Sequence, residues 1–247
     1  MSIWINSPSN ILEGNQADEM LRQINDKAYW NNETGAIEVS KERWEQAQKF
    51  ERDGWFNEWA GACSDRNHEH STIFNNYKDL PNGLGMMLEI GCGLFTQTST
   101  ILQGRTANTI FLQDPLIHQY LIHPHCNYKA ESGTTGTLCG FPAVFIGGMA
   151  ENCIIKNLIS TAICINVIEH VMSAQKVLDV LFDSLKTGGL IVFGERTYDT
   201  GYDPDKHYDI GHPVRIKSSV ILNFRKRFTV LHDYSNEQRQ YFIGQKP

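Results

Sequence analysis

The sequence predicts an α/β fold in which helices cover both faces of a mostly parallel β-sheet, preceded by an N-terminal helical extension. After residue 85, five short apolar runs alternate with helical segments, which is the pattern of a parallel sheet. The runs are almost continuously apolar, as expected for strands buried on both faces. Two further apolar runs near the end of the chain flank the turn residues Ser235-Asn236-Glu237 and predict a closing antiparallel hairpin.

The expected elements follow one another in a regular order. Strands are expected over residues 86–91, 108–113, 141–146, 158–166 and 190–194, and the closing strands over 228–232 and 240–244. Helices are expected over residues 96–103, 115–122, 151–157 and 218–227, together with one that Ser173 caps and that ends at Thr187-Gly188-Gly189. The polar, Gly-rich residues 123–140 predict a loop.

Residues 1–80 form the expected extension or lid, and residues 81–247 form the main domain. The helical spacing of Ala17, Leu21, Ile24 and Ala28 predicts one amphipathic helix. Ser40 is placed to cap a second helix, which runs on to Trp55 and Trp59. We expect Glu42 and Arg43 to lie on its solvated face.

Four of the five tryptophans lie in this extension. We favour the interpretation that they pack the helical layer onto the main domain. The alternative is that some of them line a substrate pocket, since aromatic rings offer a large and rigid contact area.

Composition and charge narrow the possible partners. The 247 residues carry a formal net charge of −6, so there is no electrostatic footprint for nucleic acid. No stretch is apolar enough to span a bilayer, and the first residues do not resemble a signal peptide. The six cysteines form no Cys-x-x-Cys pair. We therefore expect a cytoplasmic protein with no membrane partner, and its oligomeric state stays open.

The run Leu88-Glu89-Ile90-Gly91-Cys92-Gly93-Leu94-Phe95 is the most informative motif. A strand ends there in a Gly-x-Gly turn that opens a helix, so the backbone can approach a ligand closely. Asp114 follows the second strand, 23 residues after Gly91, at the distance where a carboxylate accepts hydrogen bonds from ribose hydroxyls. Asp114 is also placed to cap the helix that begins at Pro115.

A dinucleotide-binding oxidoreductase shares these features, but two details oppose it. The third glycine of Gly-x-Gly-x-x-Gly is missing. Glu89 lies two residues before the turn, where a carboxylate suits a cationic ligand better than a pyrophosphate. The expected nucleotide therefore carries positive charge and no phosphate.

The runs LEIGCG, FLQDP, ICINVIEHV and LKTGGLIVFGE together resemble the class I S-adenosylmethionine-dependent methyltransferases. The resemblance implies a Rossmann-like, seven-stranded sheet with an antiparallel last strand and S-adenosyl-L-methionine as cofactor. It implies a set of cofactor contacts: Glu89, Gly91, Cys92 and Gly93 at the methionine end, Asp114 and Pro115 at the ribose, Met149 and Ala150 along the adenine, and Asn166 and Val167 near the transferred methyl group. Two positions depart from the family pattern: Phe95 stands where a third glycine is usual, and Met149 where an acidic residue is frequent.

Glu169 and His170 follow the fourth strand and are the candidate catalytic residues. His170 suits a general base because the unperturbed pKa of histidine is about 6.5. The alternative is a histidine that only holds a neighbouring loop. The segment 198–213, with Tyr198, His207 and His212, is expected to bind the acceptor.

A metal site is the less favoured interpretation of these histidines. Glu169, His170, His207, Asp209 and His212 offer ligands, and Glu-x-x-Glu-His is the pattern of ubiquinone-pathway and small-RNA methyltransferases that this stretch resembles. Asn166 replaces its first glutamate, so we expect no metal.

The sequence thus predicts an enzyme that methylates a small molecule at oxygen, with a sugar or secondary metabolite suggested by the resemblance. The alternatives are a nucleotide-dependent oxidoreductase and a non-catalytic S-adenosylmethionine-binding protein.

Overall fold

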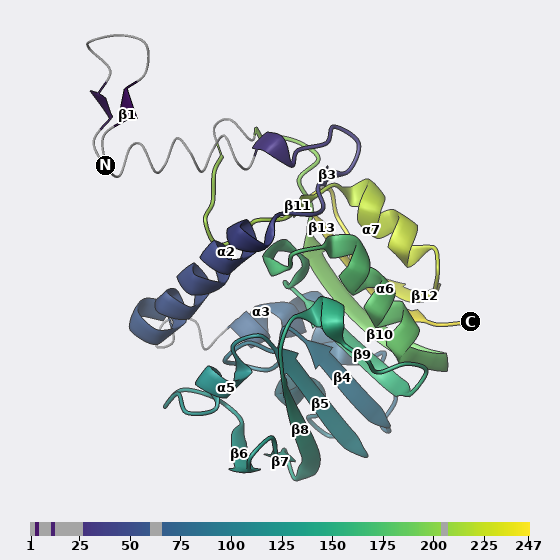
Figure 1. Ribbon diagram of the computed structural model, residues 1–247. Helices are drawn as coiled ribbons and strands as arrows, with labels where there is room; N and C mark the ends of the chain where they lie inside the picture. The colour runs from purple at the N-terminus through teal and green to yellow at the C-terminus, as the bar shows by residue number, and fades with distance from the viewer. Residues whose placement is uncertain (1–2, 5–10, 13–26, 60–65, 204–206) are drawn as a thin grey trace.

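The structure is a computed structural model that describes residues 3–4, 11–12, 27–59, 66–203 and 207–247 (Figure 1). Its main sheet has nine strands in the order β12-β13-β10-β9-β4-β5-β8-β7-β6. These strands are β4 (Met86–Ile90), β5 (Thr109–Asp114), β6 (Lys129–Ser132), β7 (Thr135–Leu138), β8 (Phe141–Gly147), β9 (Ile159–Ile165), β10 (Leu185–Arg196), β12 (Thr229–Asp233) and β13 (Arg239–Gln245).

The central strands β8, β5, β4, β9 and β10 are parallel, and β13 pairs antiparallel with both β10 and β12. The predicted α/β fold with an antiparallel last strand is therefore confirmed. The strand order turns back at β4, with β5 on one side and β9 on the other. The carboxyl ends of the strands at such a reversal are where open α/β sheets bind ligands.

The helices are α2 (Lys41–Gly54), α3 (Arg66–Ile73), α4 (Thr98–Ile101), α5 (Ile117–Tyr120), α6 (Ala174–Ser184) and α7 (Ser218–Arg225), with a π-helical turn η1 (Trp55–Trp59) and 3₁₀ turns η2 (Asn75–Tyr77), η3 (Ala150–Asn152) and η4 (Ile168–His170). Figure 1 shows α6 and α7 on one face of the sheet and α3 on the other. Alternate strand residues feed two cores: Met87 and Ile163 pack with the α3 side, whereas Leu88 and Cys164 pack with α6 and α7. Burial on both faces explains the continuous apolar runs.

The predicted loop at 123–140 was wrong, because it contains the hairpin β6–β7. β7 pairs antiparallel with β8, so the hairpin adds two strands to the seven that the sequence predicts. The hairpin turns at Gly133, whose φ is +55°. All four residues of β6 are exposed, so this edge carries no apolar alternation that would mark it as a strand.

Four predicted helices are markedly shorter than expected. Of the predicted 96–103, only α4, one turn, is helical. The segments 115–122 and 151–157 contain only α5 and η3, one turn each. The helix after Ser173 ends at Ser184, before the predicted glycine cap, because Leu185 adopts an extended conformation and pairs with Ile159. Gly188 instead lies where the register of β10 shifts between Leu185 and Leu190.

Within the extension, the structure describes residues 27–59 and 66–80. It also describes two short strands, β1 (Ile3–Trp4) and β2 (Ile11–Leu12). The predicted helix with Ala17, Leu21 and Ile24 lies outside the described residues. Ser40 caps α2 as predicted, accepting a hydrogen bond from the Arg43 amide at 3.2 Å, and the chain continues through η1 to Trp59. A second pairing, between β3 (Gly35–Ala36) and β11 (Arg215–Ile216), joins the extension to residues beyond the main parallel strands.

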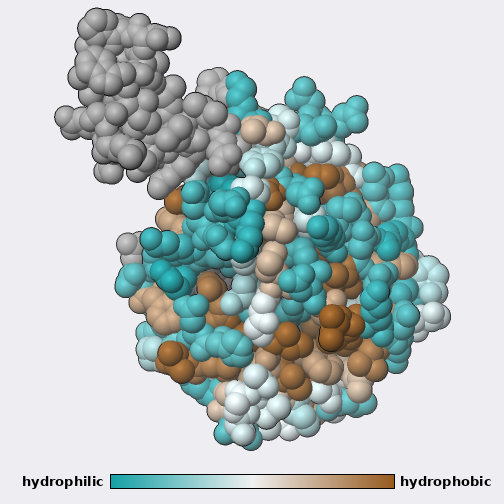
Figure 2. All heavy atoms as spheres, viewed as in Figure 1, coloured by the Kyte–Doolittle hydropathy of each residue, from teal (hydrophilic) through white to brown (hydrophobic). Residues whose placement is uncertain are grey.

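The expectation of a solvated Arg43 was wrong, although the surface over α2 is mainly hydrophilic (Figure 2). Arg43 is fully buried, and its guanidinium donates to the carbonyls of Asp209 and Ile210, each at 2.8 Å. It therefore anchors the 198–213 segment to α2. Among the described helices, none is both long and apolar enough to cross a membrane.

Candidate functional site

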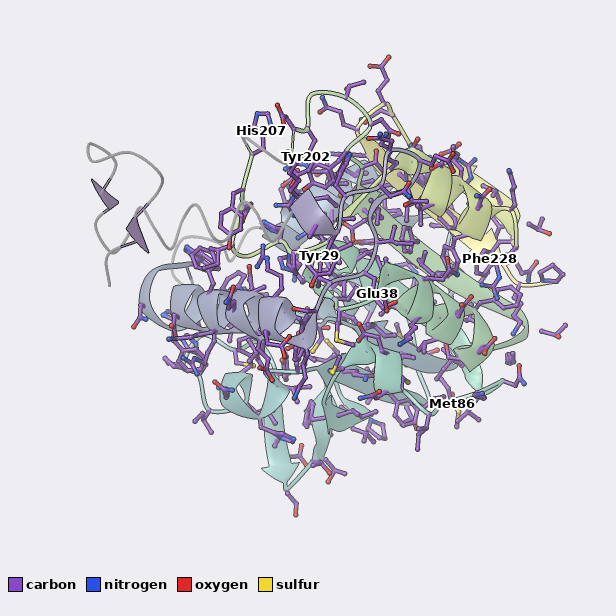
Figure 3. All side chains as sticks on the ribbon, turned by 45° about the horizontal axis from the view of Figure 1, so that its top comes forward. Tyr29, Glu38, Met86, Tyr202, His207 and Phe228 are labelled. Carbon is purple, nitrogen blue, oxygen red and sulfur yellow. The ribbon has the colours of Figure 1, made fainter. Side chains whose placement is uncertain are left out.

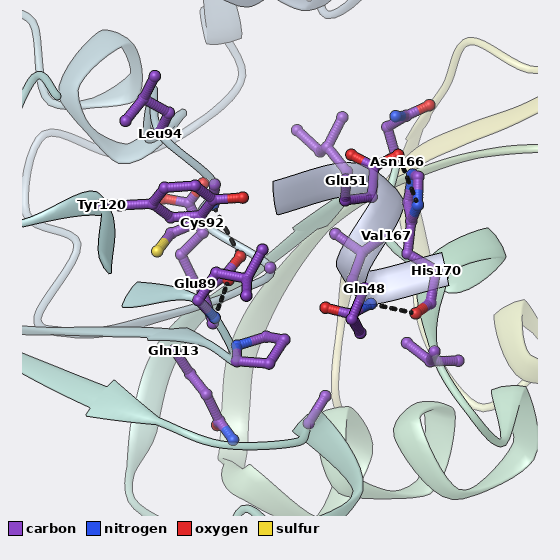
Figure 4. A pocket seen from close by; sticks show the side chains of 18 of the residues that line it. Gln48, Glu51, Glu89, Cys92, Leu94, Gln113, Tyr120, Asn166, Val167 and His170 are labelled. Atoms are coloured by element: carbon purple, nitrogen blue, oxygen red, sulfur yellow. Dashed lines mark hydrogen bonds and ion pairs between the residues drawn. The ribbon is translucent and has the colours of Figure 1, made fainter. Parts of the chain in front are cut away.

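A pocket lies at the carboxyl ends of β4, β5, β8 and β9, under α2 and η1 (Figure 4). About 1010 Å³ of the space inside it is free of protein atoms, and part of that space is open to solvent. All ten residues expected to bind the cofactor line it: Glu89, Gly91, Cys92, Gly93, Asp114, Pro115, Met149, Ala150, Asn166 and Val167. The structure brings together residues that the sequence places at the ends of four strands.

The two turn glycines have different tasks. Gly91 has φ +68°, and a Cβ there would lie 2.5 Å from Cγ2 of Val167. Gly93 has φ +58° and lines the pocket, but a Cβ there would meet no atom within 4 Å. Gly91 is thus required for packing, and Gly93 keeps the pocket floor open.

Gly91→Ala should lower the free energy of unfolding by about 2–4 kcal/mol, because it combines left-handed backbone strain with a steric clash. Gly93→Ala should cost only about 1–2 kcal/mol from the strain alone, yet weaken ligand binding in the pocket. Urea unfolding and calorimetric titration with S-adenosylhomocysteine separate the two effects. Equal loss of stability in both variants would contradict this division.

Glu89 is buried and holds the start of the helix that follows the turn. Its carboxylate accepts from the amides of Gln97 and Thr98 at 2.9 and 3.0 Å, and from the hydroxyls of Thr96 and Thr98. Burial raises the pKa of Glu89, although these donors oppose the shift. The amide groups that would bind a pyrophosphate in a dinucleotide fold are therefore already occupied by a carboxylate.

Asp114 holds the turn that leads into α5, which begins at Ile117 and not at Pro115 as predicted, and ribose binding by Asp114 stays a prediction. One oxygen accepts from the Leu116 amide at 2.8 Å, ahead of α5, and the other from the Gly93 amide at 3.0 Å. Each carboxylate oxygen keeps a further lone pair. Burial raises the pKa of Asp114 to about 6.

His170 lies on the opposite side of the pocket, beside Asn166 and Val167 (Figure 4). Its Nδ1 is 3.1 Å from the Gly211 carbonyl, so in the neutral ring Nδ1 donates and Nε2 is free to accept a proton. Burial lowers the pKa of His170 below its usual 6.5. The loop-holding interpretation and the general-base interpretation are thus compatible, because they use different nitrogen atoms.

Helix α2 covers this side of the pocket. The Trp44 indole and the Gln48 amide both donate to the His170 carbonyl at 3.1 Å, and Glu51 Oε1 lies 3.6 Å from His170 Nδ1. Trp44 and Trp55 line the pocket, as the less favoured interpretation of the tryptophans held, whereas Trp59 packs against Phe50. Sequence reasoning missed Gln48 and Glu51, since their helical spacing alone does not distinguish them from a solvated face.

Phe95 also lines the pocket, edge-on to Trp55 with ring centroids 6.0 Å apart. The phenyl ring that replaces the usual glycine therefore extends the wall that η1 contributes, and the pocket stays open beside it.

The other expected site residues do not line the pocket. Glu169 is buried behind His170, where it accepts from the Tyr198 hydroxyl at 2.5 Å and lies 3.4 Å from His212 Nε2. His212 also contacts Asp209 at 2.7 Å, and its ring lies 4.5 Å from that of His170. His207 stacks near Tyr202 at the outer side of the 198–213 segment (Figure 3).

The pKa values of Glu169, Asp209 and His212 depend on one another. Although burial opposes the change, Asp209 and Glu169 raise the pKa of His212, and His212 in turn lowers the pKa of both carboxyl groups. Glu51, His170 and His212 each place a possible metal ligand atom within 4.8 Å of the others. Glu51 was absent from the ligand set considered from the sequence.

Two glutamates that sequence reasoning missed hold backbone segments that border the pocket, and one of them, Glu151, also lines it. Glu195, on β10, accepts from the amides of Val167 and Ile168, and burial raises its pKa to about 8. Glu151 accepts from the amides of Met172 and Ser173 at 2.8 Å and so satisfies the start of α6 in place of the predicted Ser173 side chain. No local sequence signal links either carboxylate to amides twenty or more residues away.

The pocket fits a cationic nucleoside. Its described lining contains the carboxylates of Glu51, Glu89, Asp114 and Glu151 and no lysine or arginine. Gln113 donates to the Met149 carbonyl, while its buried Oε1 has no hydrogen-bond partner among the described residues. S-Adenosylmethionine, with a sulfonium and an ammonium group and no phosphate, matches these properties.

Comparison with known proteins gives structural relatives only. No protein-family profile matches the chain, and no curated protein matches it significantly. The fold is similar to phosphoethanolamine N-methyltransferase 1 of Haemonchus contortus, a structure in complex with phosphoethanolamine and S-adenosylhomocysteine, with TM-score 0.56, 13% identity, and coverage of 85% of this chain and 50% of that chain.

Two further structures share the fold. An S-adenosylmethionine-dependent methyltransferase of Thermotoga maritima, a possible histamine N-methyltransferase, aligns with TM-score 0.53 and 17% identity over 83% of this chain and 100% of that one. The cyclase SpnF aligns with TM-score 0.50 and 12% identity over 73% and 80%. The chain therefore has the fold of the class I S-adenosylmethionine-dependent methyltransferases.

Proposed function

We propose that the protein is an S-adenosylmethionine-dependent methyltransferase that transfers the methyl group to a hydroxyl oxygen of a small molecule. The observation that carries the proposal is the position of Glu89, whose carboxylate occupies the helix start that a pyrophosphate would need. The absence of lysine and arginine from the described pocket lining supports it, because a phosphate-bearing cofactor would lie there uncompensated.

The cofactor supplies an activated methyl group on a sulfonium. The glycine turn and Asp114 hold the nucleoside end, and Gln113 and Met149 border the adenine. The acceptor lies beneath α2, between Trp44, Trp55 and His170. His170 Nε2 takes the hydroxyl proton, and Gly211 holds the opposite nitrogen in the donor tautomer. Glu169, Tyr198 and His212 act behind His170 as positioning residues.

Calorimetric titration tests the cofactor and a methyl-transfer assay tests the reaction. S-Adenosylhomocysteine at 100 times its Kd should stabilise the folded state by about 2.7 kcal/mol, and NADH should have no effect. Stabilisation by NADH alone would favour the oxidoreductase. Binding of S-adenosylmethionine without turnover of any hydroxyl compound would favour a non-methylating protein, and the shared fold of SpnF shows that this scaffold does not fix the reaction.

Asp114 should make cofactor affinity pH-dependent. Its raised pKa of about 6 means that the acid form dominates below this pH, where the carboxyl loses acceptor capacity toward ribose hydroxyls. Affinity for S-adenosylhomocysteine should therefore be about tenfold weaker at pH 5 than at pH 7. In Asp114→Asn it should be weak at both values, because no carboxylate titrates. A wild-type affinity that is constant from pH 5 to 8 would refute the ribose role.

A further inference from the structure

Three of the four carboxylates that line the pocket are held by backbone amides. Glu89 accepts from Gln97 and Thr98, Asp114 from Gly93 and Leu116, and Glu151 from Met172 and Ser173. Each of these groups has a structural task at a turn or a helix start. Glu51 differs, because among the described residues its carboxylate is paired only with the side chain of His170.

His170 does not neutralise Glu51. The two side chains are 3.6 Å apart at their nearest atoms, beyond a good hydrogen bond, and Nδ1 of His170 already faces the Gly211 carbonyl. Burial lowers the pKa of His170, so the ring is neutral at pH 7. The Glu51 side chain is only 15% exposed. A carboxylate in this setting is stabilised when a cation approaches it, and the described lining supplies none.

Glu51 contacts His170, the proposed base, so a cation paired with Glu51 would belong to the acceptor. Figure 4 shows Glu51 beside His170 and near Asn166, on the other side of the pocket from Glu89 and Cys92. Trp44, from the same helix, also lines the pocket, and its indole donates to the His170 carbonyl. Indole faces attract organic cations as well as aromatic rings.

We infer that Glu51 binds a protonated amine of the acceptor, which is therefore a hydroxyl compound that also carries an amine and bears no anionic group. The inference rests on the proposed function. In the reaction the oxygen–methyl bond forms as the sulfur–methyl bond breaks, the hydroxyl proton passes to Nε2 of His170, and the ammonium paired with Glu51 keeps its protons.

A divalent metal at Glu51, His170 and His212 fits the structure less well. His212 does not line the pocket, and its Nδ1 and Nε2 face the carboxylates of Asp209 and Glu169 at 2.7 and 3.4 Å. The ring is thus arranged as a donor to two acids, whereas a metal ligand needs a free nitrogen lone pair.

Three probes of equal ring and hydroxyl but different charge test the inference: tyramine, 4-ethylphenol and 4-hydroxyphenylacetate. Their affinities are measured calorimetrically on protein saturated with S-adenosylhomocysteine. Tyramine should bind at least tenfold more tightly than the other two, and Glu51→Gln should remove this preference. Glu45→Gln is the matched control, because Glu45 is an exposed residue of the same helix that pairs with Lys41.

Several results would overturn the assignment. These are equal or unmeasurable affinities for the three probes, preference for the carboxylate, or a Glu51→Gln effect on S-adenosylhomocysteine in place of tyramine. Mn²⁺ binding that is lost in Glu51→Gln would assign the carboxylate to a metal. Failure of S-adenosylhomocysteine to bind would instead refute the proposed function, so the two failures are distinguishable.

Discussion

His170→Ala should lower kcat by about 10²–10⁴-fold, the range contributed by a positioned general base. The ring lines the pocket, and its Nε2 carries no proton in the neutral form because Nδ1 donates to the Gly211 carbonyl. The backbone carbonyl that Trp44 and Gln48 contact survives the substitution, so α2 should stay in place. Affinity for S-adenosylhomocysteine should change by less than about twofold.

Two controls separate catalysis from loop support. His170→Gln retains a side-chain donor for the Gly211 carbonyl but no base, so it should be as inactive as the alanine variant. His212→Ala alters the neighbouring ring outside the pocket and should reduce kcat far less. An active His170→Gln variant would show that the ring only holds the loop.

The pH dependence of kcat tests the same role of His170. The base must be neutral, and burial lowers the pKa of His170 from its usual 6.5, so kcat should fall to half its plateau only below pH 6.5. A half-maximal kcat above pH 7 would point to another group.

The cofactor side of the site could be predicted because its signals are local in the sequence. Gly91 and Gly93 follow an apolar strand, and Asp114 follows the next, so parallel pairing of β4 and β5 brings them to one edge. The acceptor side could not be predicted in this way. Glu51 reaches the pocket only because α2 docks on the His170 carbonyl, and that contact joins residues more than a hundred positions apart.

The wrong predictions for Arg43 and for the β6–β7 hairpin share one cause. Arg43 reads as a solvated charge until Asp209 and Ile210 supply their carbonyls, and the exposed hairpin β6–β7 has strand structure because β8 offers an edge to pair with. In both cases the partner is distant in sequence and the local pattern is polar. Hydrophobic periodicity detects buried apolar side chains, whereas Arg43 is a buried charge and all four residues of β6 are exposed.

Glu89→Ala should lower the free energy of unfolding by about 3–5 kcal/mol and weaken cofactor binding by at least tenfold. The substitution leaves the Gln97 amide and two threonine hydroxyls without an acceptor, in a site where Glu89 is only 3% exposed. The Thr98 amide keeps only the Thr96 hydroxyl as its acceptor. Each orphaned buried donor costs about 1–3 kcal/mol, partly recovered where water enters.

Glu89→Gln distinguishes shape from charge. The amide keeps one acceptor oxygen and the volume of the side chain, but its NH₂ group faces donors, so it should destabilise by less than alanine does. It also removes a negative charge from beside the methionine ammonium of the cofactor, which S-adenosylhomocysteine retains, so its effect on S-adenosylhomocysteine binding should exceed its effect on stability. Urea unfolding with and without S-adenosylhomocysteine measures both quantities in one experiment. If both variants unfolded at the wild-type urea midpoint, Glu89 would not hold the helix start, and the argument that its carboxylate excludes a pyrophosphate would fail with it.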